Sequence, residues 1–249
     1  MSPPLSSPVL VACLAAFASL VLPHSRVGRV LLYPFSLLAT WVHECGHAFS
    51  TLLVGGTVQQ VTLHANLSGS ATSSRPDTPF SHAFTAAAGL LAPSLLGGVL
   101  IILSAFPSVS SDALFGLALT LLLTGLLWVR NLFGLCAIAL LSGVSFAAAY
   151  LLPPVLQYAV LQVAGARLAL ESLSDFGYMF SRTARTVDGG SLPSDTERIA
   201  QALFPPYWFW GLLVAVISTL ILIVSLYVAL RLHVPEASTP LRDLIPPFP

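Results

Sequence analysis

Residues 41–49 have the sequence Trp41-Val42-His43-Glu44-Cys45-Gly46-His47-Ala48-Phe49 and lie inside a longer apolar run, residues 30–54. A run of this length can cross a membrane as a tilted helix, and Gly55-Gly56 predicts its end. On a helix His43 and His47 lie one turn apart and about 40° apart around the axis, so both imidazoles can reach one metal ion. The stretch therefore predicts a metal site within a membrane helix.

The composition excludes a water-soluble globule. Of the 249 residues, 56% are hydrophobic and 8% are charged, and the mean hydropathy is +0.87. Ten basic residues balance ten acidic ones, so no charge excess attracts nucleic acid, and we expect no nucleic-acid partner. We predict one integral membrane domain over residues 1–249, an all-α polytopic protein with six or seven transmembrane helices and one small β-hairpin after the second helix.

Other apolar runs predict the remaining spans, at residues 8–22, 84–106, 114–129, 132–152, 155–173 and 207–232. The run 155–173 contains Gln157, Gln162 and Arg167, so it stays open whether this run crosses, and the count is therefore six or seven. The last run begins with Tyr207-Trp208-Phe209-Trp210, which is typical of the aromatic belt at a membrane interface.

Three segments lie outside the predicted spans. Residues 55–82 carry β-branched residues around a turn that contains Gly69, which predicts a hairpin loop. Residues 172–206 hold seven of the chain's twenty charged residues and form the main aqueous segment. Residues 233–249 form a proline-rich C-terminal tail.

The His-Glu-x-x-His pattern has the chemistry of a zinc site. Two histidines and one further protein ligand leave a fourth tetrahedral position for water, whose pKa the metal lowers. Glu44 can take a proton from this water and pass it to a leaving amine. Ionisable residues inside an apolar span are costly unless they are paired or used, so we interpret this set as functional rather than accidental.

The chain resembles the site-2 protease family of intramembrane zinc metallopeptidases, and within it the small membrane-peptidase-like branch. The resemblance rests on four motifs that together cover most of residues 40–215: His43-Glu44-Cys45-Gly46-His47-Ala48 followed by Gly55-Gly56, Gly89-Leu90-Leu91-Ala92-Pro93 with Gly97, Arg130-Asn131-Leu132-Phe133-Gly134, and Ser194-Asp195 before Trp208. It implies a Zn²⁺ site within the membrane that cleaves transmembrane substrates. In the better-known branch an Asn-Pro-Asp-Gly or Leu-Asp-Gly string supplies the third ligand, and no such string occurs in an apolar run here.

Asp195 is our predicted third ligand, because the Ser194-Asp195 pair resembles the small branch and a carboxylate suits zinc beside two imidazoles. A helix cap is the alternative, since Ser194 and Glu197 have the spacing of a capping box and an Asp in a first helical turn is favoured without metal. Other possible ligands are Asp175, Asp188, His64 and His82. If the third to sixth segments all cross, four crossings return the aqueous segment to the hairpin face, where Asp195 can reach the metal.

Small residues recur in the third predicted span. Gly89, Pro93 and Gly97 are spaced by four and permit the close approach of another helix. Ordinary helix packing is one explanation of this spacing. The alternative is a functional role, in which this helix lies against His43 and His47. Asn131 could donate a hydrogen bond to a developing oxyanion, or it could simply be an interfacial residue at a helix start.

These features predict a zinc-dependent intramembrane endopeptidase that cleaves a transmembrane helix by metal-activated water, with Glu44 as the base and His43, His47 and Asp195 as ligands. The substrate helix must unwind locally, and the hairpin could hold the unwound strand by edge pairing. The alternative is a non-proteolytic zinc-containing membrane protein that binds or retains client helices. A third class is a transporter that uses the motif as a proton or metal relay. The sequence lacks the paired discontinuous helices expected of that class. The predicted partners are transmembrane protein substrates and the lipid bilayer.

Overall fold

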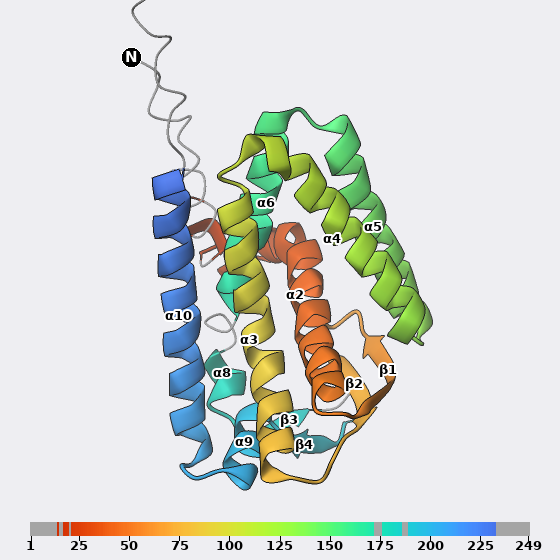
Figure 1. The fold of residues 1–249 in the computed structure, drawn as a ribbon, viewed down its shortest axis with the longest axis vertical. Helices are drawn as coiled ribbons and strands as arrows, with labels where there is room; N and C mark the ends of the chain where they lie inside the picture. Colours follow the sequence, from red (N-terminus) through yellow and green to blue (C-terminus); the bar gives the residue numbers. More distant parts are fainter. Residues whose placement is uncertain (1–13, 15–16, 20, 172–175, 186–188, 233–249) are drawn as a thin grey trace, which may run out of the picture.

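The computed structural model describes residues 14, 17–19, 21–171, 176–185 and 189–232, which form a mostly helical bundle with two small hairpins (Figure 1). The long helices are α2 (Arg26–Leu53), α3 (Pro79–Leu103), α4 (Pro107–Trp128), α5 (Leu132–Leu151), α6 (Pro154–Ala169) and α10 (Tyr207–Leu232). The short elements are the 3-10 helix η2 (Leu22–His24), helices α8 (Phe176–Met179) and α9 (Asp195–Ala202), and strands β1 (Thr57–Leu63), β2 (Gly69–Ser74), β3 (Thr183–Arg185) and β4 (Ser191–Pro193).

Within the described part of the chain, four helices are long and apolar enough to cross a membrane. They are α3, residues Ser108–Trp128 of α4, α5 and α10. The predicted count of six or seven spans is not confirmed. Helix α6 has only 16 residues, which is short for a bilayer, and α2 has 28 residues but carries both histidines and Glu44. The predicted span at residues 8–22 lies mostly outside the described residues.

The hairpin expected within residues 55–82 is formed by β1 and β2, which pair antiparallel from Thr57 with Ser74 to Leu63 with Gly69. The expectation of one hairpin is wrong, because β3 and β4 form a second one in the aqueous segment, from Thr183 with Pro193 to Arg185 with Ser191. Strands of three residues are too short to show the alternation of apolar and polar residues that identifies a strand in a sequence.

Helix α2 ends where the sequence predicts. Gly55 has a φ of +80°, and the N–H of Gly56 donates to the carbonyl of Thr51 at 2.9 Å. This left-handed turn closes the helix and directs the chain into β1. The end of α2 is thus set by a residue that adopts positive φ without steric cost.

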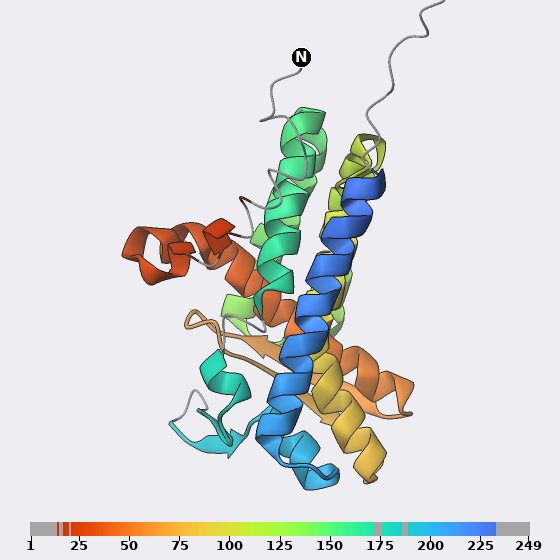
Figure 2. The same ribbon diagram turned by 90° about the vertical axis from the view of Figure 1, so that its left-hand side faces the viewer.

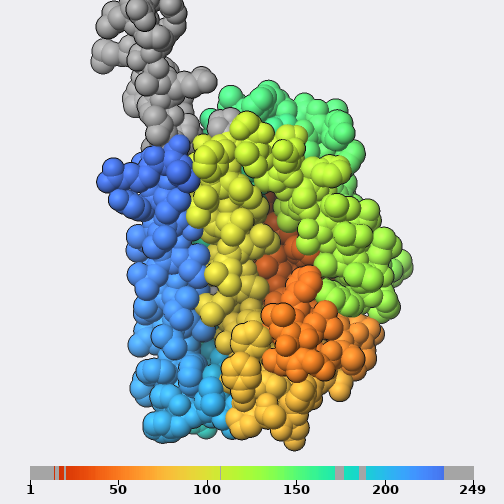
Figure 3. All heavy atoms as spheres, viewed as in Figure 1, coloured from red at the N-terminus to blue at the C-terminus, as the bar shows by residue number. Residues whose placement is uncertain are grey.

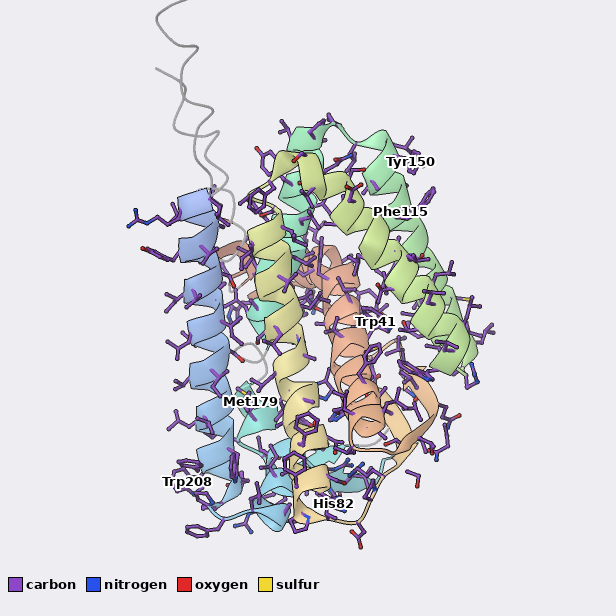
Figure 4. All side chains as sticks on the ribbon, viewed as in Figure 1. Trp41, His82, Phe115, Tyr150, Met179 and Trp208 are labelled. Atoms are coloured by element: carbon purple, nitrogen blue, oxygen red, sulfur yellow. The ribbon has the colours of Figure 1, made fainter. Side chains whose placement is uncertain are left out.

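Helix α2 lies obliquely to the axis along which α3, α6 and α10 run (Figure 2). Trp41, which Figure 4 labels, is buried in the core shared by α2, α4, α5, α6 and β1, and its indole N–H donates to the Thr124 hydroxyl of α4 at 3.2 Å. On the face shown in Figure 3, atoms of α2 remain visible between α3 and the pair α4 and α5. The helix that carries the histidines therefore crosses the interior of the bundle.

Candidate metal centre

The side chains of His43, His47 and Asp195 converge, although Asp195 follows His47 by 148 positions in the sequence. Their ligand atoms form three short distances: 3.0 Å between the two histidine Nε2 atoms, 3.1 Å from His43 Nε2 to Asp195 Oδ2, and 3.4 Å from His47 Nε2 to the same oxygen. These three residues make up the one group of potential metal ligands found among the described residues.

The spacing of these atoms fits a zinc ion. Ligand atoms around a tetrahedral zinc with bonds of about 2.0–2.1 Å lie about 3.3–3.4 Å apart, close to the distances seen here. Two imidazole nitrogens and one carboxylate oxygen are also a donor set that catalytic zinc sites use, with one position left for water or substrate. The residues present therefore fit the metal that the sequence predicts.

A backbone group orients the imidazole of His47. Its Nδ1 lies 2.8 Å from the carbonyl oxygen of Thr85 in α3. A carbonyl can only accept, so Nδ1 carries the proton and Nε2 of the neutral ring keeps its lone pair for a metal. Helix α3 thereby selects the tautomer that a ligand needs.

Gly89 of α3 leaves the space that this imidazole occupies. A Cβ built on Gly89 overlaps the ring atoms of His47. At the residue before His47 in α2, a Cβ on Gly46 would lie 2.6 Å from the carbonyl oxygen of Ala88. The small residues noted in the sequence thus set the distance between α2 and α3 at the histidines, and Gly97 does the same between α3 and α6, facing Gly165.

We expect Gly89→Ala to weaken zinc binding about 10- to 100-fold, the usual effect of disturbing a group that orients a metal ligand. The added methyl group must displace the His47 ring, while alanine itself favours the helix. Zinc content measured against a series of chelators of graded strength tests this. Gly143→Ala in α5 is the matched control, because its Cβ meets nothing within 4 Å. Equal zinc retention in both variants would contradict the prediction.

The beginning of α9 brings Asp195 to the histidines. Ser194 is the cap of this helix, and its hydroxyl accepts from the N–H of Glu197 at 3.2 Å and donates to the carbonyl of Ser181 at 2.6 Å. Thr196 donates to the carbonyl of Met179 at 3.0 Å. The two readings of the Ser194-Asp195 pair are therefore compatible, because the serine supplies the cap and the aspartate faces the histidines.

Tyr178 of α8 holds the Asp195 carboxylate, with its hydroxyl donating to Oδ2 at 2.8 Å. Burial, and then the neighbouring Asp195 carboxylate, raise the pKa of the Tyr178 phenol, so the hydroxyl stays protonated. Burial of Asp195 opposes ionisation, but His47 and His43 outweigh it and hold the pKa of Asp195 well below its usual value. The carboxyl is thus a carboxylate, the form that binds a metal.

Glu44 is buried, with 5% of its surface exposed, and lies beside the histidines on α2. Gly69 at the start of β2 covers it, since a Cβ on Gly69 would lie 2.7 Å from Glu44 Cγ and Oε1. The carboxylate is therefore held between the metal-binding group and the hairpin.

Two clefts meet at His43 and Glu44. The bundle cleft has a volume of about 500 Å³ and extends towards the middle of α3; its lining includes Thr40, Leu67, Leu90, Pro93, Glu171 and Met179. The hairpin cleft has a volume of about 450 Å³ and extends towards the end of the molecule that carries the hairpins; its lining includes Gln60, Thr62, Ser70, Ser73, Arg75 and Arg198. The same end carries Trp208, which Figure 4 labels near His82, as expected for an interfacial aromatic residue. An extended peptide could therefore pass from one cleft to the other across the histidines.

Asn131 fastens the hairpin and does not face the histidines. Its side-chain oxygen accepts from the N–H of Leu63 at 3.2 Å, and its amide donates to the carbonyl of the same residue at 2.6 Å. The N–H of Arg130 donates to the carbonyl of Val61 at 3.2 Å. Asn131 lines neither cleft at the histidines, and Leu63 engages both its oxygen and its nitrogen, so the structure does not support the oxyanion role considered for it. The connection between α4 and α5 thus covers the outer edge of β1, while the described part of the chain supplies no strand for the other edge of β2.

The other residues considered as third ligands are not part of the ligand group that the described residues form. Asp175 and Asp188 lie outside the described residues. His64 lines the hairpin cleft but is not part of the ligand group. The imidazole of His82 is engaged by Asp77 and Arg75, at 2.8 and 3.1 Å.

Sequence reasoning missed Tyr178, Thr85 and Gly69 as parts of this site. Tyr178 lies in a charged segment without a recognisable motif, and Thr85 contributes a backbone carbonyl, which any residue type possesses. Gly69 was recognised only as a turn residue. Its place above Glu44 depends on how the hairpin folds back on α2.

Comparison with protein families gives one match, a family model described as Peptidase M50B-like, over residues 10–225. No curated protein and no solved structure matches the chain. The family match includes α2, both clefts and α9.

Proposed function

Because this chain belongs to the Peptidase M50B-like family, we propose that it is a zinc-dependent intramembrane endopeptidase that cleaves transmembrane helices of substrate proteins. The observation that carries the proposal is the convergence of His43, His47 and Asp195 beside the buried carboxylate of Glu44. A zinc-binding protein that only retained client helices would not need a buried carboxylate next to its ligands.

His43, His47 and Asp195 would hold the metal, which when bound supplies Lewis acidity towards a peptide carbonyl and a water molecule. Glu44 would accept a proton from the attacking water and transfer it to the nitrogen of the leaving amine. The water oxygen first bonds to the carbonyl carbon, and the C–N bond then breaks as the nitrogen receives the proton from Glu44, which gives a carboxylate and an amine. Tyr178 would keep Asp195 in position through the bond at 2.8 Å.

A helical substrate must present an extended peptide, because its carbonyls are otherwise enclosed in helical hydrogen bonds. The edge of β2 that pairs with no strand of the described residues offers backbone groups to such a peptide by strand addition. Strand β2 begins over Glu44 at Gly69 and continues along α2 to Ser73, whose hydroxyl accepts from Thr51 at 3.1 Å. An added strand would therefore pass directly beside the base.

The test is a cleavage assay with the purified full chain and a single-span substrate protein in detergent or liposomes. We expect one zinc per chain, cleavage within the span, loss of cleavage after treatment with a chelator, and recovery when Zn²⁺ is added back. Magnesium at the same concentration is the control, because a site with two imidazoles disfavours it. A zinc-containing preparation that cleaves no transmembrane substrate would favour the binding protein instead.

A further inference from the structure

Two arginines line the hairpin cleft, close to the site, and neither forms an ion pair with a carboxylate among the described residues. Arg75 follows β2 and Arg198 lies on α9, and both side chains are partly buried. No carboxylate of the described residues lies within ion-pair distance of either guanidinium. The acidic residues that line this cleft are Glu44 and Asp195, which the proposed reaction itself uses.

Arg75 is held in place from outside the cleft. Its Nη2 donates to His82 Nδ1 at 3.1 Å, and His82 Nε2 donates to the exposed carboxylate of Asp77 at 2.8 Å. His82 lies near the start of α3, at the end of the bundle that carries the hairpins (Figure 4). This chain of contacts orients the guanidinium but leaves its Nε buried without a partner.

Arg198 is fixed by one hydrogen bond, from Nε to the carbonyl of Pro193 at 3.3 Å. Arg75 and Arg198 line the same cleft. Burial, and then the like charge of Arg198, lower the pKa of Arg75, while the charge of Asp195 acts in the opposite direction. Like charges placed together at low dielectric cost free energy that a bound anion would recover. Two oriented guanidinium groups are also well suited to bind a carboxylate.

We propose that Arg75 and Arg198 form a subsite for an acidic side chain of the substrate, on the aqueous side of the scissile peptide bond. This inference rests on the proposed endopeptidase function and adds a substrate preference to it. A carboxylate is the anion that the cleft favours, because an extended peptide along β2 leads from Glu44 into this cleft.

The position of the acidic residue follows from the geometry of α9. Arg198 is three residues after Asp195, so its Cα lies about 5 Å further along the helix, and its side chain extends the reach by several ångströms. An extended substrate advances about 3.3 Å per residue. The acidic side chain should therefore lie about two to four residues from the scissile bond.

The experiment compares two single-span substrates that differ only by Glu or Gln at these positions, with the cleavage site located by mass spectrometry. We expect the wild-type chain to cleave the Glu substrate with a kcat/KM about 10- to 100-fold higher, the usual value of a charge-assisted hydrogen bond. In the double variant Arg75→Gln, Arg198→Gln this ratio should fall to about one. Arg231→Gln is the matched control, because Arg231 stacks on Tyr227 in the last turn of α10 and should leave the ratio as in the wild type.

Binding provides a second readout that needs no cleavage. In the Glu44→Gln background, the Glu substrate should bind more tightly than the Gln substrate, and the two arginine substitutions should remove the difference. Equal binding and equal cleavage of both substrates by the wild type would overturn the subsite while leaving the endopeptidase proposal intact. The subsite would also be overturned if the arginine substitutions left the cleavage ratio unchanged but abolished a dependence of activity on anionic lipid. That result would assign the two arginines to a lipid headgroup. If no substrate is cleaved but the binding difference is present, the subsite stands and the proposed reaction fails.

Discussion

Replacing Glu44 with Gln is expected to reduce cleavage of a transmembrane substrate by about 10²- to 10⁴-fold, the contribution of a positioned general base. The amide has the shape of the carboxylate but cannot accept the proton of the attacking water. Among the described residues, Asp195 is the other carboxylate of the hairpin cleft and Glu171 that of the bundle cleft, and neither lies on α2 beside the histidines as Glu44 does. Zinc should remain bound, since Glu44 is not among the three converging ligand atoms.

Two measurements on the same preparation check this expectation: zinc per chain by elemental analysis, and initial rates of cleavage. Glu197→Gln is the matched control, because this glutamate lies on α9 outside the ligand group and its side chain accepts from Gln201 at 3.4 Å. Wild-type turnover by the Glu44→Gln variant would show that Glu44 is not the base. Loss of zinc together with activity would show that it acts on the metal rather than on the proton.

Replacing Asp195 with Ala is expected to lower zinc affinity by more than about 100-fold, the upper end of the effect of losing a residue that merely orients a ligand. The substitution removes the oxygen that lies 3.1 Å and 3.4 Å from the two histidine nitrogens. It also leaves the Tyr178 hydroxyl without its acceptor. Activity should be lost with the metal, and His43→Ala should have the same effect on zinc content.

The role of a cap can be separated from the role of a ligand because different side chains perform them. Ser194→Ala should cost about 0.5–2 kcal/mol of stability and leave the zinc in place. Asp112→Ala, an exposed carboxylate in α4, is the control for the loss of one negative charge. Full retention of zinc by Asp195→Ala would remove this residue from the ligand set and direct the search to Asp175 and Asp188.

Several features of the site were predictable because they depend on residues that are near one another in the sequence. His43 and His47 share a helical face by periodicity alone, and Glu44 must lie beside them. Gly55 ends α2 because it tolerates positive φ, and the hairpin follows from β-branched runs around a turn. The His-Glu-x-x-His motif predicts a metal site because its residues are likewise close together in the sequence.

Other features depended on packing between distant segments. Nothing in the sequence indicates that Tyr178 reaches Asp195, that Thr85 offers its carbonyl to His47, or that Asn131 binds the backbone of Leu63. The hydropathy pattern also could not predict the number of spans, because it does not show that α6 stops after 16 residues. Its apolar run looks like a span, but it ends inside the bundle.

The sequence by itself determined that the two histidines and Glu44 lie together on one helix, since a helix places residues four apart on one face whatever surrounds it. Only the tertiary structure shows that Asp195, which its resemblance to the small branch had predicted, converges with the two histidines. Asp195 was one of several acidic residues in a charged segment, and its selection required α8 and α9 to fold against α3 and the hairpin. Contacts over such a separation are set by the packing of whole elements, and no local periodicity encodes them.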